Sequence, residues 1–326
     1  MRAVGLYEFG GPAVLRAVDL PEPHAGPGEV RVRVHAAAVN PADTLLRSGV
    51  LAHLFAGVPA PYVPGMDIAG VIDEIGPGTE TALSPGEPVM AMTHPIGPAT
   101  GGYAEYVVLP AGWVVRAPAG ADHPAAATLP MNGLTALLTL DRLALAPGSV
   151  LAVVGAAGTL GGYLVELGRQ AGLTVVADAA PADEDLIRRS GAADIVARGS
   201  DVAERIRARY PEGVAAVADA ALAGPRLLHA VRDGGRYVRF RTAGEPGGQE
   251  IDGGGRVTVL TPFVPDYAGR TDKLDRIRLL AESGALTPRV AAALPAAEAP
   301  EAHRRLGPAV FAAGSCSPSE LASTRP

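Results

Sequence analysis

The feature that most constrains this chain is a glycine-rich turn between an apolar strand and a helix. Residues 150–154 (VLAVV) form a continuous apolar run, which is typical of a strand buried on both faces of a parallel sheet. The next residues place Gly155, Gly158 and Gly161 at intervals of three. A tight turn, a close approach of the backbone to a ligand and close packing of the helix on the strand each favour a residue without a Cβ atom. The pattern predicts a turn that binds the diphosphate of a dinucleotide.

The start of the helix after this turn is the second part of the expected phosphate site. The first backbone N–H groups of a helix have no partner within it, and together with the helix dipole they attract negative charge. The candidate cofactor-binding residues of the turn are Gly155, Ala156, Gly158, Thr159, Leu160 and Gly161. A glycine-rich turn without a ligand is the alternative. The position of the turn in a βαβ unit, after a buried strand and before a helix, favours the ligand.

Asp178 is the second indication of a cofactor. It lies 23 residues after Gly155, at the end of the next apolar strand, which we expect over 173–177. A carboxylate at that place accepts hydrogen bonds from the adenosine ribose hydroxyls and repels a 2′-phosphate, which favours NAD(H) over NADP(H). The alternative is a solvated aspartate in a turn, because acidic residues follow at 183–185.

Strands and helical segments alternate through the middle of the chain. A helical pattern over 122–145 precedes the glycine turn. The alternation continues after Asp178, with helices expected at 183–190, 202–209 and 225–231 and strands at 194–196, 214–219 and 236–241. This order predicts a doubly wound parallel sheet.

The first part of the chain is rich in short strands, and its last part is mixed. Residues 30–34 (VRVRV) alternate apolar and charged side chains, which indicates a half-buried strand. Further strands are expected at 70–75, 89–92 and 103–109, and helices near the end at 272–283 and 297–306. We therefore expect an α/β protein with a β-rich domain over 1–118, a dinucleotide-binding domain over 119–260 and a return to the first domain over 261–326. A disordered tail is expected from about residue 315.

Composition excludes several classes of protein. The net charge of −6 offers no basic surface for nucleic-acid phosphates. Cys316 is the only cysteine, so the chain forms neither an intramolecular disulfide nor a cysteine-rich zinc site. No uninterrupted run of about 20 apolar residues is present to span a membrane. The first ten residues lack the apolar core of a signal peptide, and the simplest location is the cytoplasm.

Motifs along nearly the whole chain resemble one family. They are AAAVNPADTLLRSG at 36–49, PYVPGMDIAGVIDEIGPGT at 61–79, GGYAEYVVLP at 101–110, LPMNGLTALLTL at 129–140 and RRSGAADIV at 188–196, in that order around the glycine turn. The chain resembles a zinc-independent medium-chain dehydrogenase/reductase of the quinone oxidoreductase, or zeta-crystallin-like, group. This implies a GroES-like β-rich domain, a Rossmann-type parallel-sheet domain and an active cleft between them. It also implies a homodimer.

The resemblance bears on metal binding. Zinc-dependent relatives carry an early cysteine ligand and then a Gly-His-Glu segment. Here the corresponding residues are Asn40 and Gly65-Met66-Asp67. Asn and Met are poor zinc ligands compared with thiolate and imidazole, so we expect no zinc.

The resemblance also implies the reaction and its residues. Without a metal, the expected step is hydride transfer from NAD(P)H to a small-molecule quinone or to the C=C bond of an enone, with charge developing on an oxygen. Asn40, in the N-P-x-D motif, is expected beside the nicotinamide; an asparagine capping the turn before Pro41 is the alternative. Thr135 matches a position near the nicotinamide ribose, or is an ordinary helix threonine. Tyr62 is a candidate proton donor or pocket residue, or a structural tyrosine at a strand end.

Two questions stay open on sequence grounds. The family implies NADP(H), whereas Asp178 indicates NAD(H). The scaffold also suits a non-redox step such as a cyclisation in secondary metabolism, or a nucleotide-binding protein that is not an enzyme.

Overall fold

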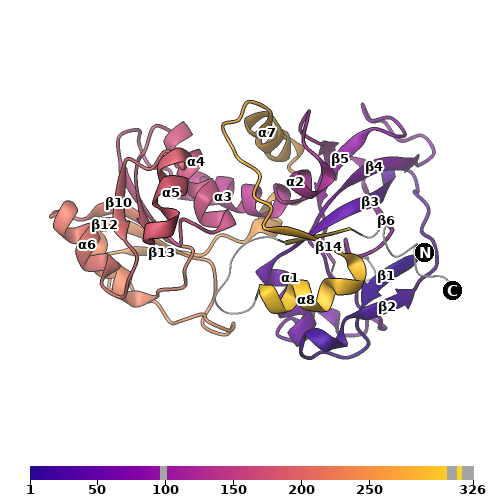
Figure 1. Cartoon of the computed structure of the whole chain (residues 1–326), viewed down its shortest axis with the longest axis horizontal. Helices are drawn as coiled ribbons and strands as arrows, with labels where there is room; N and C mark the ends of the chain where they lie inside the picture. The colour runs from indigo at the N-terminus through magenta and orange to yellow at the C-terminus, as the bar shows by residue number, and fades with distance from the viewer. Residues whose placement is uncertain (96–100, 307–313, 318–326) are drawn as a thin grey trace. The chain divides into compact units, whose positions relative to one another are not determined.

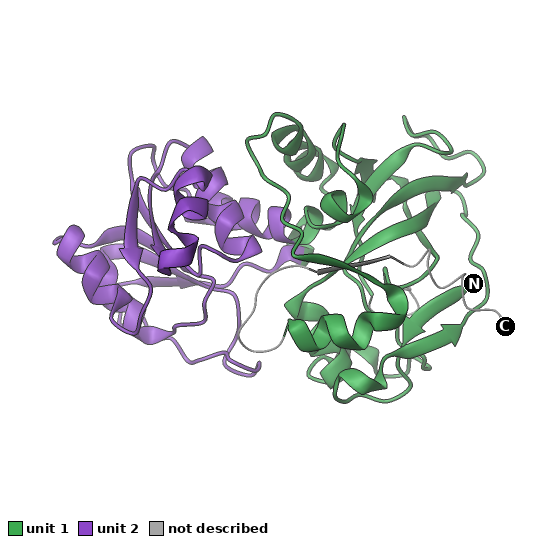
Figure 2. Ribbon diagram, viewed as in Figure 1, with its two compact units in different colours: residues 1–131, 265–326 green, residues 132–264 purple. Residues whose placement is uncertain are grey.

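The computed structural model describes residues 1–95, 101–306 and 314–317, and the chain forms two compact units. Unit 1 comprises residues 1–131 and 265–326, and unit 2 comprises residues 132–264 (Figure 2). The sequence predicted the same three-part order with boundaries after residues 118 and 260. The first boundary lies later because helix α2 (His123–Ala127) packs against strands β3 (Glu29–Val39) and β4 (Asp67–Ile75) of unit 1.

Unit 1 is built on antiparallel strands. Its described residues form a sheet with the strand order β14-β15-β3-β4-β5-β7, and β6 also pairs with β3. The further strands of this sheet are β5 (Pro88–Met92), β6 (Tyr106–Pro110), β7 (Val114–Arg116), β14 (Ala292–Pro295) and β15 (Gly314–Ser317). A separate hairpin pairs β1 (Arg2–Gly5) with β2 (Arg16–Asp19). The alternation at 30–34 is confirmed, since Val30, Val32 and Val34 are buried in the core.

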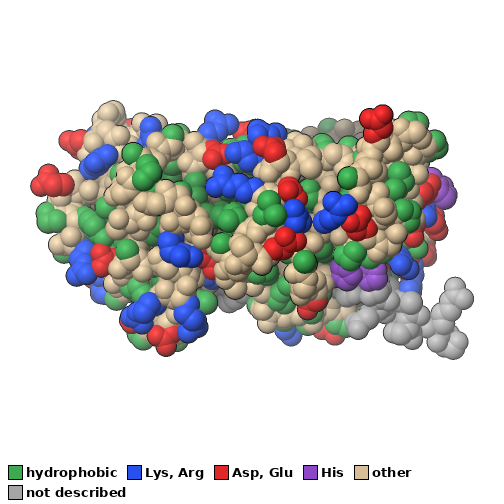
Figure 3. Space-filling model, turned by 90° about the horizontal axis from the view of Figure 1, so that it is seen from above, with side chains coloured by type: hydrophobic (Ala, Val, Ile, Leu, Met, Phe, Trp, Pro, Cys, Tyr) green, Lys and Arg blue, Asp and Glu red, His purple; other side chains and the backbone are tan. Residues whose placement is uncertain are grey.

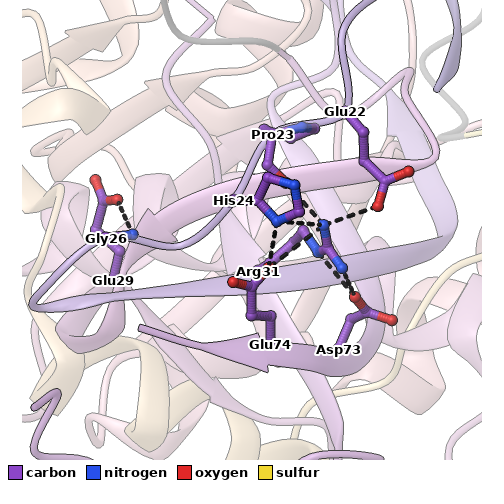
Figure 4. A network of polar contacts seen from close by, with 8 residues as sticks. All are labelled: Glu22, Pro23, His24, Gly26, Glu29, Arg31, Asp73 and Glu74. Carbon is purple, nitrogen blue, oxygen red and sulfur yellow. Dashed lines mark hydrogen bonds and ion pairs between the residues drawn. The ribbon is translucent and has the colours of Figure 1, made fainter. Parts of the chain in front are cut away.

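Arg31 on β3 joins the sheet to the segment before it. Its guanidinium donates to Asp73 Oδ2 on β4 at 2.8 Å from Nε, and to Glu22 Oε1 at 2.9 Å from Nη1 (Figure 4). The carbonyl of Pro23 accepts a third hydrogen bond, and the guanidinium lies 4.8 Å from the centre of the Tyr106 ring. These contacts hold residues 22–24 against the sheet.

Within the described residues, the end of the chain contains two strands that the sequence did not predict, β14 and β15. Residues 315–317 were expected to begin a disordered tail, but they belong to β15, which pairs in parallel with β14 and antiparallel with β3. Strand pairing uses backbone groups, so the edge of β3 can recruit a segment that lacks an apolar pattern. The prediction for residues 318–326 lies outside the described residues.

Unit 2 confirms the predicted doubly wound fold. Its described residues form a parallel sheet of six strands in the order β10-β9-β8-β11-β12-β13. Figure 1 labels β10, β12 and β13 of this sheet. The strands are β8 (Val150–Val154), β9 (Thr174–Ala179), β10 (Asp194–Ala197), β11 (Val214–Asp219), β12 (Val231–Arg239) and β13 (Thr258–Leu260). The strand order reverses at β8, with β9 on one side and β11 on the other. Ligands of such sheets bind beyond the carboxyl ends of the strands at this point.

Helices connect the strands in both units. They are α1 (Pro41–Ser48), α3 (Pro130–Leu143), α4 (Thr159–Gln170), α5 (Glu184–Ser190), α6 (Val202–Arg209), α7 (Thr271–Glu282) and α8 (Ala299–Arg305). The helix expected over 122–145 is divided into α2 and α3, because Pro130 cannot continue a helix but starts one readily. The segment expected as a helix at 225–231 is the 3-10 helix η5 (Pro225–Ala230), which packs with α6 on one face of the sheet.

The surface shows no grouping of charge by sign on the face drawn in Figure 3, where basic and acidic side chains are interspersed. Within the described residues, no helix has both the length and the apolar character needed to cross a membrane.

Candidate functional site

The glycine turn after β8 is closed by backbone contacts that exclude side chains. Gly155 has φ +88°, and a Cβ atom there would lie 2.8 Å from the carbonyl carbon of Ala220 and from the nitrogen of Ala221. A Cβ atom on Gly161 would lie 2.2 Å from the carbonyl oxygen of Gly155. Gly158 is the N-cap residue of α4. Helix α4 therefore presses directly on the turn and directs the positive end of its dipole toward it, as a diphosphate site requires.

Asp178 lies next to this turn, and the structure shows what its carboxylate contacts. Oδ1 accepts hydrogen bonds from the backbone nitrogens of Gly155 at 2.6 Å and Ala156 at 3.0 Å. Oδ2 pairs with Arg198 Nε at 3.2 Å, and Arg198 also pairs with Asp183 at 3.3 Å. The Asp178 side chain is 2% exposed. The carboxylate thus braces the turn, and its expected contact with a ribose stays a prediction.

Asp219 is a residue that the sequence reasoning missed. It ends β11, on the other side of β8, and its carboxylate accepts hydrogen bonds from the backbone nitrogens of Ala223 at 2.9 Å and Gly224 at 2.8 Å. The Tyr237 hydroxyl donates to it at 2.6 Å, and burial together with this carboxylate raises the pKa of Tyr237. Asp219 therefore shapes the loop that touches Gly155. The available signal was an aspartate at the end of a buried strand, the same position that Asp178 holds.

In unit 1, Asn40 lies at a buried corner between β3 and α1. Its side-chain nitrogen donates to Asp67 Oδ2 at 2.8 Å, and its backbone nitrogen donates to Asp43 Oδ2 at 2.8 Å. Asp43 Oδ1 accepts from the nitrogen of Gly65, and Asp67 Oδ1 accepts from the nitrogen of Met131, the second residue of α3. Asn40 caps α1, as its alternative reading expected, and its side chain is also held by Asp67. The Asn40 corner is defined here as these five residues.

Burial alters the acidity of both carboxyl groups in the Asn40 corner. Desolvation raises the pKa of Asp43 to about 7, although backbone hydrogen bonds oppose the rise. Desolvation also raises the pKa of Asp67 well above its usual value, and the neighbouring Asp43 adds to this effect. The donors around both groups are neutral backbone and amide N–H groups, so burial favours the protonated, uncharged form of each carboxyl group.

The donor set at this corner does not fit a catalytic zinc ion. The Asn40 amide nitrogen is committed as a donor to Asp67, and the neighbouring Met66 offers a thioether. Among residues 1–95, 101–306 and 314–317, no group of three or more His, Cys, Asp or Glu side chains is placed to hold a metal ion. The expected absence of zinc stays a prediction.

Tyr62 belongs to an aromatic cluster of unit 1. Its ring stacks on Phe9 at 5.1 Å between centroids and tilts against Phe55 at 4.9 Å. Its hydroxyl donates to the carbonyl of Val58 at 3.2 Å. These contacts support the structural reading of Tyr62, and its role as a proton donor stays a prediction.

Thr135 lies in the second turn of α3 and is partly exposed. Its carbonyl accepts a hydrogen bond from the Thr139 hydroxyl at 2.7 Å, a contact that any helix residue could make. The structure thus groups the expected residues into two places. The turn residues and Asp178 lie together in unit 2, and Asn40 lies at its corner in unit 1.

Comparison with known proteins covers both units. A family model for the alcohol dehydrogenase GroES-like domain matches residues 26–119, and one for zinc-binding dehydrogenases matches residues 190–308. A quinone oxidoreductase from Pongo abelii is 33% identical over 203 residues, which are 60% of this chain and 58% of that protein. The chain thus matches little more than half the length of this relative.

Solved structures match over almost the whole chain. An NAD-dependent alcohol dehydrogenase superposes with a TM-score of 0.84 and 29% identity, covering 97% of this chain and 99% of that one. A mycobacterial protein solved in complex with NADPH superposes with a TM-score of 0.81 and 27% identity, again covering 97% and 99%. Both units thus match dehydrogenases in the order that the motifs predicted, and the chain is similar to the quinone oxidoreductase group of the medium-chain dehydrogenase/reductases.

Proposed function

We propose that this chain is an NAD(P)H-dependent oxidoreductase that transfers hydride to a quinone or to the C=C bond of an enone, without zinc. The observation that carries the proposal is the turn after β8. A Cβ atom on Gly155 or Gly161 would collide with the backbone, and the turn lies where the strand order of the sheet reverses. The names of the relatives, quinone oxidoreductase among them, support the reaction class.

The residues of unit 2 bind and orient the cofactor in this proposal. The first turn of α4 places its positive dipole end beside the diphosphate. Asp178 fixes the turn after β8, and Asp219 fixes the loop after the neighbouring strand β11. A bound reduced nicotinamide supplies the hydride.

The Asn40 carboxamide is the proposed polar contact of unit 1 with the nicotinamide or with the substrate oxygen. Its support is that Asp67 holds the side chain in a fixed orientation. When hydride adds to the β-carbon of an enone, negative charge develops on the carbonyl oxygen as an enolate. A solvent proton then completes the saturated ketone, and the Tyr62 hydroxyl, which donates to the carbonyl of Val58, is the alternative source of that proton.

The cofactor proposal includes both nicotinamides. Asp178 disfavours a 2′-phosphate, but Arg198 lies against the same carboxylate and against Asp183, and its side chain is 44% exposed. A guanidinium beside the adenosine ribose site can bind a 2′-phosphate by donating hydrogen bonds to it. The expected homodimer and cytoplasmic location stay predictions.

A spectrophotometric assay tests the function. We expect the purified protein to bleach the 340 nm absorbance of NADPH or NADH when 9,10-phenanthrenequinone or a simple enone is added, and not without acceptor. The rate should be unchanged by a zinc chelator, and metal analysis should find no stoichiometric zinc. Saturable cofactor binding without turnover on either acceptor would favour the non-redox readings. Stoichiometric zinc, or loss of activity with the chelator, would overturn the zinc-independent part.

A further inference from the structure

Asp67 is a buried carboxylate with a defined partner at each oxygen. The residue has no exposed surface. Oδ2 accepts from the Asn40 side-chain nitrogen at 2.8 Å, and Oδ1 accepts from the backbone nitrogen of Met131 at 2.6 Å. Because β4 begins at Asp67 and α3 contributes Met131, the carboxylate is fixed from two elements and cannot rotate without breaking a hydrogen bond.

A carboxamide held in this way has a determined orientation. Rotation of an asparagine side chain by about 180° exchanges its nitrogen and oxygen with little change in shape, so packing alone selects neither orientation. Both oxygens of Asp67 act as acceptors, from the Asn40 side chain and from the backbone of Met131, so the Asn40 nitrogen faces Asp67 and the Asn40 oxygen faces away from it.

Asp43 offers an internal comparison. It is as fully buried as Asp67, but its partners are backbone nitrogens, those of Asn40, Gly65 and Met66. Asp43 therefore holds the chain at the corner, whereas Asp67 contacts the functional group of Asn40. Asp43 thus places the backbone of the corner, and Asp67 orients the Asn40 side chain.

We infer that Asp67 is a positioning residue that sets which atom of the Asn40 carboxamide is offered to the nicotinamide or substrate. This inference rests on the proposed function, in which Asn40 makes that contact. Burying a carboxyl group against neutral donors costs free energy. In this geometry the buried group gives the Asn40 side chain a specific orientation.

A double-mutant cycle tests the inference. Asp67→Asn has nearly the same shape but can both donate and accept, so it no longer selects one orientation of Asn40. We expect kcat to fall about tenfold, the scale of one lost hydrogen bond, while dinucleotide affinity changes less than about twofold. In an Asn40→Ala background, Asp67→Asn should cause no further fall in kcat, because no carboxamide is left to orient.

Asp43→Asn is the matched control for a buried carboxyl group of the same corner. Its effect should persist in the Asn40→Ala background, because the backbone nitrogen of residue 40 is retained. Unchanged kcat in Asp67→Asn, or an equal fall in both backgrounds, would overturn the positioning role. Absence of turnover in the unaltered protein would instead overturn the proposed function.

A second measurement does not depend on turnover. The Asn40 side-chain NH2 pair in a 1H–15N spectrum, assigned by its disappearance in Asn40→Asp, should show one proton shifted downfield and protected from exchange. Asp67→Ala should remove the shift and the protection. An Asn40 pair that is the same in both proteins would show that Asp67 does not hold the carboxamide.

Discussion

The turn after β8 and the Asn40 corner are built in opposite ways. The turn consists of backbone from seven consecutive residues, 155–161, and its requirement is that Gly155 and Gly161 carry no side chain. The corner consists of side chains and backbone groups from three separate segments, around residues 40–43, 65–67 and 131. The comparison shows that a site built from consecutive residues, such as the turn, depends on positions without a Cβ atom. A site assembled from distant segments depends on where its charges are placed.

The largest effect is expected from the charges of the corner. The folded-state pKa of Asp43 is raised from 3.8 to about 7, so its contribution to stability is complete below about pH 4 and is lost as pH rises toward 7. At 1.36 kcal/mol per pKa unit, the loss is about 4 kcal/mol. We expect urea unfolding at pH 4 to 8 to show that the free energy of unfolding of the unaltered protein, relative to Asp43→Asn, falls by this amount. Parallel pH profiles for the two proteins would refute the prediction.

The next effect concerns the space in the turn. Gly161→Ala places a methyl group 2.2 Å from the carbonyl oxygen of Gly155, and neither backbone segment can move cheaply. We expect a loss of about 3 kcal/mol in the free energy of unfolding and at least a tenfold loss of dinucleotide affinity, by titration calorimetry.

Gly168→Ala on the same helix is the control for this change. There the methyl group would meet the side chain of Val175 at 3.0 Å, and a side chain can shift. Alanine also favours the helix, so the stability should change by less than about 1 kcal/mol. Similar losses in both variants would show that the turn has no special need for glycine at 161.

The smallest effect separates two readings of Asp178. We expect Asp178→Ala to lower the affinity for NADH and NADPH alike, by about tenfold, because the turn loses the acceptor for two of its backbone nitrogens. A loss confined to NADH would show instead that the carboxylate reads the ribose. Arg198→Ala, which leaves the bonds from the turn to Asp178 in place, should lower NADPH affinity selectively.

The local sequence pattern was sufficient to predict most helices and strands of unit 2. The predicted bounds of β8, α6 and β11 agree with the structure, because each is a short apolar or amphipathic run ended by glycine, proline or a charged residue. The glycines of the turn could be identified for the same reason, since their spacing is a property of consecutive residues.

Asp178 shows where this reasoning stopped. Its position beside the turn could be predicted from its place at the end of a strand, but its partners could not, because Arg198 comes from the neighbouring strand end. Asp219 was missed because its place at the end of a strand does not show which backbone groups of the next loop donate to it.

The sequence by itself determined the two-part architecture, the parallel sheet and the phosphate turn, since periodicity and glycine spacing act over a few residues. Only the tertiary structure decided that β15 joins the edge of β3 and that Asp67 meets Asn40, 27 positions away in the chain. Pairing at an edge and burial of a charge depend on which distant groups the fold brings together, and no short stretch of sequence contains that information.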